Sequence, residues 1–141
     1  MFLNYAFFSQ LKVDYLVRLR IEYYPDMKFI EHKDANGTVV EVATDEIAIS
    51  SEQDALDLMA NIGYLYDCNR IIIHKENLSE DFFDLKSGLA GGILQKFSNY
   101  RVQLFVVGDF TAYTSSSLKE FILESNKGKQ VNFIPDLSAI L

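Results

Sequence analysis

The sequence predicts a single α/β domain with a mixed sheet whose central strands are parallel and carry helices packed on them. Short apolar runs alternate with longer amphipathic segments from residue 50 onward, and this alternation is typical of parallel strands joined by helical crossovers. Ahead of them, the runs 28–32 (KFIEH) and 38–43 (TVVEVA) flank an Asn36-Gly37 turn, which predicts an N-terminal β-hairpin and therefore an antiparallel edge. The length of 141 residues fits one domain.

Helices are expected where apolar residues recur at helical spacing. The first begins near Ser50, because Gln53 follows it at the spacing of a capping box. The second is expected over residues 80–100 with Ser79 as its N-cap, and the third begins after Ser115 or the preceding threonine.

The remaining strands are expected at residues 70–74 (RIIIH), 102–107 (VQLFVV) and 131–134. The first two are continuous apolar runs, as in strands that are covered on both faces. Together with the hairpin and the helices they complete an order of elements that predicts the mixed sheet.

Residues 1–26 are expected to be an N-terminal extension, a helix or an extended arm, ahead of a single α/β domain of residues 27–141. The apolar start MFLNYAFF has no basic flank and no small-residue cleavage site, so we expect neither a signal peptide nor a membrane span. The coherent pattern begins at Met27, which could itself be the initiator.

The composition disfavours several classes of partner. The net charge is −7 and the 13 basic residues are scattered, which argues against direct binding to nucleic acid or to an anionic membrane. The one cysteine, Cys68, allows no intramolecular disulfide and no thiolate metal site. We therefore expect a cytoplasmic protein without a metal or another cofactor, in which Cys68 is inert packing.

No catalytic signature stands out in the sequence. The two histidines, His32 and His74, lie on different expected strands and have no Ser or Cys partner nearby, so nothing indicates a triad. Asp81 and Asp84 share a helix face but make a weak cation site without further ligands. The sequence favours a protein that is not an enzyme.

The first candidate surface is a polar, glycine-rich side of the expected helix 80–100. Three glycines inside a helix cost about 1 kcal/mol each relative to alanine, and such a bare stripe lets another backbone come close. The neighbour is either a helix of the same chain or a protein partner, including a second copy. The candidate partner-binding residues are Asp81, Asp84, Gly88, Gly91, Gly92 and Gln95.

Lys86 falls amid the apolar side of the same helical wheel. A buried lysine would act as a base or an amine nucleophile. The alternative is that its stem packs and its ammonium reaches a carboxylate, such as Asp109 or Glu124.

The second candidate site lies after the strand 102–107, at the edge of the sheet where open α/β folds usually bind ligands. Hydroxyls and backbone N–H groups crowd the start of the helix that follows, and these groups could bind a small anionic or polar ligand. The alternative is ordinary helix capping. The candidate ligand-binding residues are Asp109, Tyr113, Thr114 and Ser115, with Lys86 in support.

Residues 79–100 (SEDFFDLKSGLAGGILQKFSNY), followed by RVQLFVVGDF and YTSSSLKEFILESNKG, resemble the bacterial family called domain of unknown function 4180. The resemblance spans residues 27–141 and implies no activity. The order of strands and helices also resembles sulfate-transporter and anti-sigma-antagonist (STAS) domains, in which a serine at the start of the helix after a central strand can be phosphorylated. By position that serine is Ser79; the alternative is a plain N-cap, because nearby acidic residues would repel a phosphate.

These observations favour a bacterial regulatory or protein-interaction module that docks a partner or a second copy through the helix 80–100. The alternative is a small-ligand-binding protein or enzyme with its site near Asp109, supported by Lys86 or His74. A filled strand edge at Asp109 would favour the first interpretation, and an open pocket would favour the second.

Overall fold

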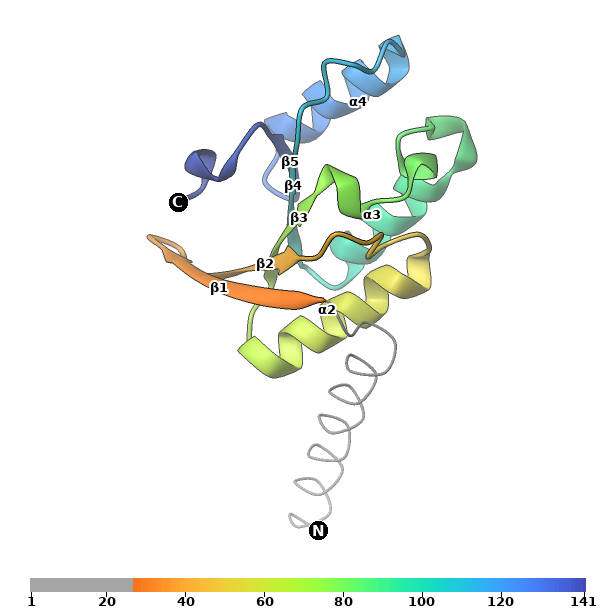
Figure 1. The fold of residues 1–141 in the computed structure, drawn as a ribbon. Coiled ribbons are helices and arrows are strands. Elements are labelled where there is room, and N and C mark those ends of the chain that lie inside the picture. Colours follow the sequence, from red (N-terminus) through yellow and green to blue (C-terminus); the bar gives the residue numbers. More distant parts are fainter. Residues whose placement is uncertain (1–26) are drawn as a thin grey trace, which may run out of the picture.

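The computed structural model describes residues 27–141, and the expected extension 1–26 lies outside this part. One five-stranded sheet runs through the domain in the order β1-β2-β3-β4-β5 (Figure 1). The hairpin strands β1 and β2 are antiparallel, and every later neighbour is parallel, so the predicted mixed sheet is confirmed. The strands are β1 (Lys28–Asp34), β2 (Gly37–Ala43), β3 (Arg70–His74), β4 (Gln103–Val107) and β5 (Val131–Ile134).

The hairpin closes between Asp34 and Gly37, which pair across the two strands. Gly37 has a φ of 110°, a conformation that a side chain disfavours. Within the turn, Asp34 accepts a hydrogen bond from the backbone N–H of Asn36 at 2.8 Å. The turn therefore forms as predicted, with the positive φ at the glycine alone.

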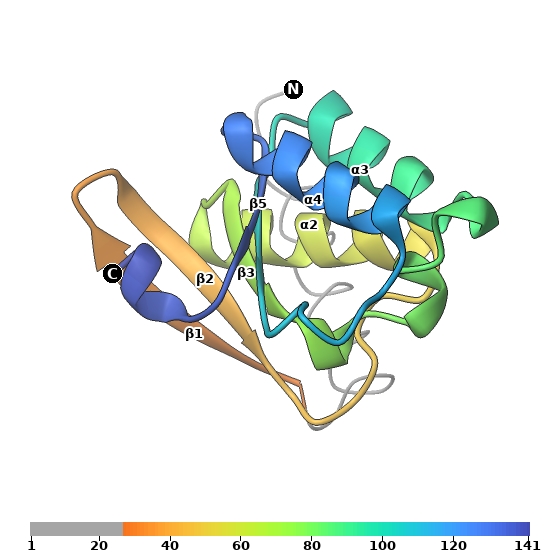
Figure 2. The same ribbon diagram turned by 90° about the horizontal axis from the view of Figure 1, so that it is seen from above.

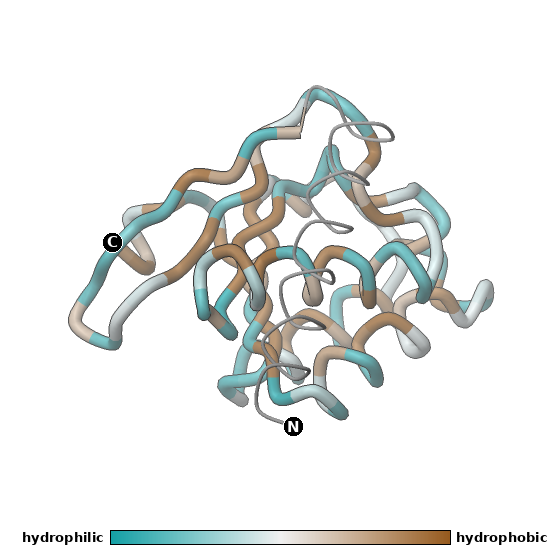
Figure 3. The backbone as a smooth tube through the Cα atoms, turned by 90° about the horizontal axis from the view of Figure 1, so that it is seen from below, coloured by the Kyte–Doolittle hydropathy of each residue, from teal (hydrophilic) through white to brown (hydrophobic). Residues whose placement is uncertain are grey.

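Three α-helices cover one face of the sheet: α2 (Glu52–Tyr66), α3 (Leu89–Asn99) and α4 (Ser116–Lys127) (Figure 2). Their apolar residues form one core with alternate residues of the strands, such as Val40, Ile71 and Val106. Figure 3 shows the same concentration of apolar residues along the central strands. None of the helices within residues 27–141 is long and apolar enough to cross a membrane.

The opposite face of the sheet carries a smaller apolar cluster of Val39, Ile72, Phe105 and Val107. The C-terminal 3₁₀ turn η4 (Leu137–Ala139) lies on the same face, and Leu137 and Ile140 pack against the cluster. This explains why the central strands read as continuous apolar runs, since both of their faces are covered.

The helix expected over residues 80–100 is shorter than predicted. Two 3₁₀ turns, η2 (Glu80–Phe82) and η3 (Leu85–Ser87), precede α3. Gly88 separates η3 from α3 with a φ of 78°, and a residue in this left-handed conformation cannot continue a right-handed α-helix. Sequence periodicity missed the break because the apolar spacing continues across it.

The caps agree with most of the predicted helix starts. Ser79 caps η2 and Ser115 caps α4. The first helix is capped by Ser51, whose hydroxyl accepts from the N–H of Asp54 at 3.1 Å, and not by Ser50. The hydroxyl of Ser50 instead donates to the Asp54 carboxylate.

Candidate functional site

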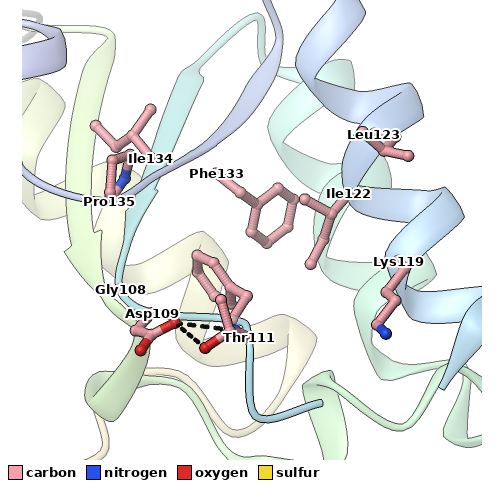
Figure 4. A pocket seen from close by; sticks show the side chains of 10 residues that line it. Gly108, Asp109, Thr111, Lys119, Ile122, Leu123, Phe133, Ile134 and Pro135 are labelled. Atoms are coloured by element: carbon pink, nitrogen blue, oxygen red, sulfur yellow. Dashed lines mark hydrogen bonds between the residues drawn. The ribbon is translucent and has the colours of Figure 1, made fainter. Parts of the chain in front are cut away.

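The carboxyl ends of β4 and β5 and the facing side of α4 surround a cavity of about 520 Å³ (Figure 4). Most of its lining is apolar, with two phenylalanines in edge-to-face contact at 5.4 Å between ring centroids. Leu123, at 66% exposed, also lines it. The apolar lining residues are Phe110, Ile122, Leu123, Phe133, Ile134 and Pro135. The predicted edge therefore carries an open pocket.

Asp109 follows β4 and lines the cavity. Its Oδ1 accepts hydrogen bonds from the hydroxyl of Thr111 at 2.7 Å and from the backbone N–H of Thr111 at 2.9 Å. These bonds hold the pKa of Asp109 below its usual range. The carboxylate is thus a fixed anion that shapes the loop after β4.

Lys119 supplies the cationic side chain of the lining. It is exposed on α4, and it forms no ion pair with the residues that the structure describes. Figure 4 shows its side chain on α4 and Asp109 on the strand side of the cavity. Sequence reasoning missed this residue, although it lies three and four positions before Ile122 and Leu123 on the helix, which are spacings that share a face.

The loop between β4 and α4 is tied to the preceding turns by two side chains. The Lys75 ammonium donates to the backbone carbonyl of Asp109 at 3.0 Å and lies 4.8 Å from the ring centroid of Tyr113. The Tyr113 hydroxyl donates to the Glu80 carboxylate at 3.3 Å, and its ring stacks on Phe83 at 5.0 Å. These contacts fix one side of the cavity.

Tyr113 holds the loop between β4 and α4 against the preceding turns and does not line the cavity. Burial, together with the charge and the hydrogen bond of the neighbouring Glu80 carboxylate, raises the pKa of Tyr113 to about 12. Thr114 is exposed, and the hydroxyl of Ser115 accepts from the N–H of Leu118 as the N-cap of α4. Of the four loop residues predicted to bind a ligand, Asp109 lines the cavity, Tyr113 and Ser115 support the loop, and Thr114 is exposed outside the cavity lining.

Lys86 does not occupy the apolar position that the helical wheel indicated. It lies in η3, outside α3, and is exposed. Its backbone N–H donates to the Asp84 carboxylate at 3.2 Å. The wheel was wrong here because residues 80–88 are not part of an α-helix.

The glycine-rich face consists of residues with different environments. Gly88 holds a φ of 78°. A Cβ atom on Gly92 would collide with the carboxylate of Glu52 on α2, whereas a Cβ atom on Gly91 would meet nothing within 4 Å. The atoms nearest to such a Cβ atom on Gly92 belong to the end of an exposed, flexible side chain, which can move aside.

The polar residues predicted on that face make local contacts. The Asp84 carboxylate caps η3. Gln95 donates from its amide to Asn99 at 2.8 Å along α3. Asp81 is exposed, and its backbone carbonyl accepts from the Ser87 hydroxyl at 2.6 Å. The structure brings Asp81 and Asp84 near the start of α3, while Gln95 lies two turns along that helix.

Both histidines meet one buried carboxylate on the sheet face opposite the helices. Glu41 is 8% exposed. Its Oε1 lies 2.8 Å from Nε2 of His32 and its Oε2 lies 2.6 Å from Nε2 of His74. Each imidazole contacts a different oxygen of Glu41. The two imidazole nitrogens and the carboxylate therefore do not surround one point where a metal ion could bind. Among residues 27–141, no group of three or more His, Cys, Asp or Glu side chains is arranged to hold a metal ion.

The described residues thus define a mixed-sheet α/β domain with a cavity of ligand-binding size at the carboxyl end of its parallel strands. The chain belongs to the family described as domain of unknown function (DUF4180), whose model matches residues 34–141. This confirms the family resemblance, with a match that begins at the last residue of β1. No curated protein and no solved structure matches the chain, and the likeness to STAS domains stays a prediction.

Proposed function

We propose that this protein is a small-molecule-binding domain whose ligand occupies the cavity between β4, β5 and α4. The observation that carries the proposal is the open, largely apolar cavity of about 520 Å³ at this edge of the sheet. Small-molecule sites typically enclose about 300–1,000 Å³ and are mostly apolar with a few polar groups. The carboxyl edge of parallel strands is also where open α/β sheets usually bind ligands.

The chemistry of the lining favours binding over catalysis. The carboxylate of Asp109 is engaged by Thr111, and the Lys119 ammonium is exposed and has no carboxylate partner among the described residues. The Thr111 hydroxyl lies beside the Asp109 carboxylate, but the lowered pKa of Asp109 makes that carboxylate a weak general base. A binding or sensing role therefore needs fewer additional assumptions than an enzymatic one.

A partner-docking role for the glycine-rich face has less support than the cavity. Its main argument was that interior glycines imply a close neighbour outside the helix. The positive φ of Gly88 gives that glycine a reason within the chain, and Gly88 precedes α3 as its N-cap. Gly91 and Gly92 remain available to a partner, but the expected stripe of three glycines inside one helix does not form.

The test is a thermal-shift screen of a metabolite library with a variant that fills the cavity. Ile122→Trp places an indole among the lining residues, and Ile47→Trp is the matched control, because Ile47 is 49% exposed and lies outside the cavity lining. We expect a ligand that raises the Tm of the wild type and of Ile47→Trp but not of Ile122→Trp. A screen without such a compound, or equal shifts in both variants, would refute the proposal.

A further inference from the structure

The charged residues of the cavity indicate which kind of small molecule it binds. We propose that the ligand has an apolar, ring-sized body and an anionic group such as a carboxylate, and that Lys119 binds the anion. This inference rests on the proposed function and names its ligand class. Its first ground is that Asp109 and Lys119 are the two charged residues of the lining.

Asp109 and Lys119 differ in whether their charged groups already have partners within the described part of the chain. The Asp109 carboxylate accepts two hydrogen bonds from Thr111 within its own loop. No carboxylate of residues 27–141 pairs with the Lys119 ammonium. A bound anion would give this ammonium the charge-assisted partner that the described part of the chain does not provide.

The sequence of α4 explains why Lys119 has no partner on its own helix. Carboxylates stabilise a helical lysine from positions three or four residues away. Those positions hold Ser115, Ser116, Ile122 and Leu123 around Lys119. The carboxylate of Glu124 pairs instead with Lys127 at 3.0 Å. Lys119 therefore shares its helix face with apolar cavity residues and with no acid.

The apolar walls determine the rest of the ligand. Phe110 and Phe133 meet edge to face, and Ile122 extends from α4 toward Phe133 (Figure 4). Flat aromatic and branched aliphatic side chains of this kind favour a ring or a branched hydrocarbon. Leu123, which is 66% exposed beside them, would be covered by a ligand whose anionic group extends to Lys119.

The overall charge of the chain is negative, so the positive charge of Lys119 distinguishes the cavity from the rest of the surface. With a net charge of −7, most of the surface repels an anion. An exposed ammonium that lines an apolar cavity and pairs with no carboxylate of residues 27–141 is thus the feature that would select an anionic ligand over a neutral one of the same shape. Because Lys119 is exposed, we expect a preference of about five- to tenfold and not more.

The test uses three probes that share an indole ring and differ in charge: indole-3-acetate, indole-3-ethanol and tryptamine. The chain contains no tryptophan, so the fluorescence of the probe reports its own environment. We expect indole-3-acetate to bind about five- to tenfold more tightly than indole-3-ethanol, and tryptamine to bind most weakly. Lys119→Met should remove the difference between the first two while leaving indole-3-ethanol unchanged. Lys127→Met, on the last turn of the same helix, should preserve it.

The outcomes separate the two proposals. Equal binding of all three probes, or tightest binding of tryptamine, overturns the anionic ligand class and leaves a binding cavity. A preference for the anion that survives in Lys119→Met overturns the role of Lys119. Binding of none of the three, in the wild type as well as in both variants, overturns the apolar binding site and with it the ligand class.

Discussion

Glu41 and His74 lie on neighbouring parallel strands, and Oε2 of the carboxylate is 2.6 Å from Nε2 of the imidazole. The same carboxylate reaches His32 on β1 through its other oxygen. One side chain of β2 thereby links the edge strand β1 to the central strand β3. A carboxylate accepts both bonds when each imidazole carries its hydrogen on Nε2, so the link depends on the ionisation of Glu41.

We predict that acidification destabilises the domain partly through Glu41. Burial opposes its ionisation, but hydrogen bonds from His74 and His32 and their positive charge outweigh burial and lower the pKa of Glu41 below its ordinary 4.5. The unfolded chain then binds more protons than the folded one, so this stabilisation is complete above about pH 5 and is lost as the pH falls through the folded-state pKa. Urea unfolding at a series of pH values measures the loss.

Glu41→Gln isolates this contribution. An amide can accept from one imidazole but presents a donor to the other, which we expect to cost about 1–2 kcal/mol at neutral pH. The variant should also lose less stability than the wild type between about pH 5 and pH 3, because it lacks the titrating group. Parallel curves for the two proteins across that range would contradict the assignment to Glu41.

Single alanine substitutions should separate the three glycines near α3. Gly91→Ala meets open space, so helix propensity should stabilise the domain by up to about 1 kcal/mol. Gly92→Ala displaces only the end of the exposed, flexible Glu52 side chain, so we expect a smaller gain. Gly88→Ala places a side chain at a φ of 78° and should cost about 1 kcal/mol. Thermal unfolding measures the order of stability of the three variants. Destabilisation by Gly91→Ala would indicate that this surface contacts a second molecule.

Much of the fold followed from local patterns. The turn at Asn36-Gly37 and the apolar runs 70–74 and 102–107 each depend on residues close in sequence, and their order restricts the sheet to few topologies. The break at Gly88 did not follow, because a glycine in a periodic segment reads equally well as part of a helix.

The site was only partly predictable for a related reason. Asp109 could be predicted as a site residue because ligands usually bind at the carboxyl ends of parallel strands, and the order of strands in the sequence is enough to locate those ends. Lys119 belongs to the site because it lines the cavity together with Ile122 and Leu123 of α4, and helical spacing does not reveal whether a face is covered. The Glu41 cluster depends on the register of three strands, which no local pattern in β1, β2 or β3 specifies.

Asn77 should be a strong determinant of stability. It is 1% exposed, and its amide donates to the backbone carbonyls of Thr44 at 2.8 Å and Glu46 at 2.9 Å. Asn77→Ala would leave those carbonyls without this donor and open a small cavity, so we expect a loss of about 2–4 kcal/mol. Asn132→Ala, which removes one bond from a half-buried side chain, should lose less. Equal unfolding midpoints in urea for the two variants would contradict this role.

Gly108 follows β4 directly and lies against the turn η1 (Lys75–Asn77). A Cβ atom on Gly108 would lie 2.6 Å from Cβ of Lys75, and an atom attached directly to the backbone cannot rotate away. Gly108→Ala should therefore destabilise the domain by about 1–3 kcal/mol. It should also displace the Lys75 ammonium from the carbonyl of Asp109, because the stem of that side chain has to move.

Gly128→Ala is the matched control, since its Cβ atom would come no closer than 3.8 Å to the carbonyl oxygen of Ser125. We expect it to change the unfolding free energy by less than about 0.5 kcal/mol. Amide chemical shifts of residues 109–115 should move in Gly108→Ala and stay in place in Gly128→Ala. If Gly108→Ala left both stability and these shifts unchanged, the loop beside the cavity would not depend on the close contact between Gly108 and Lys75.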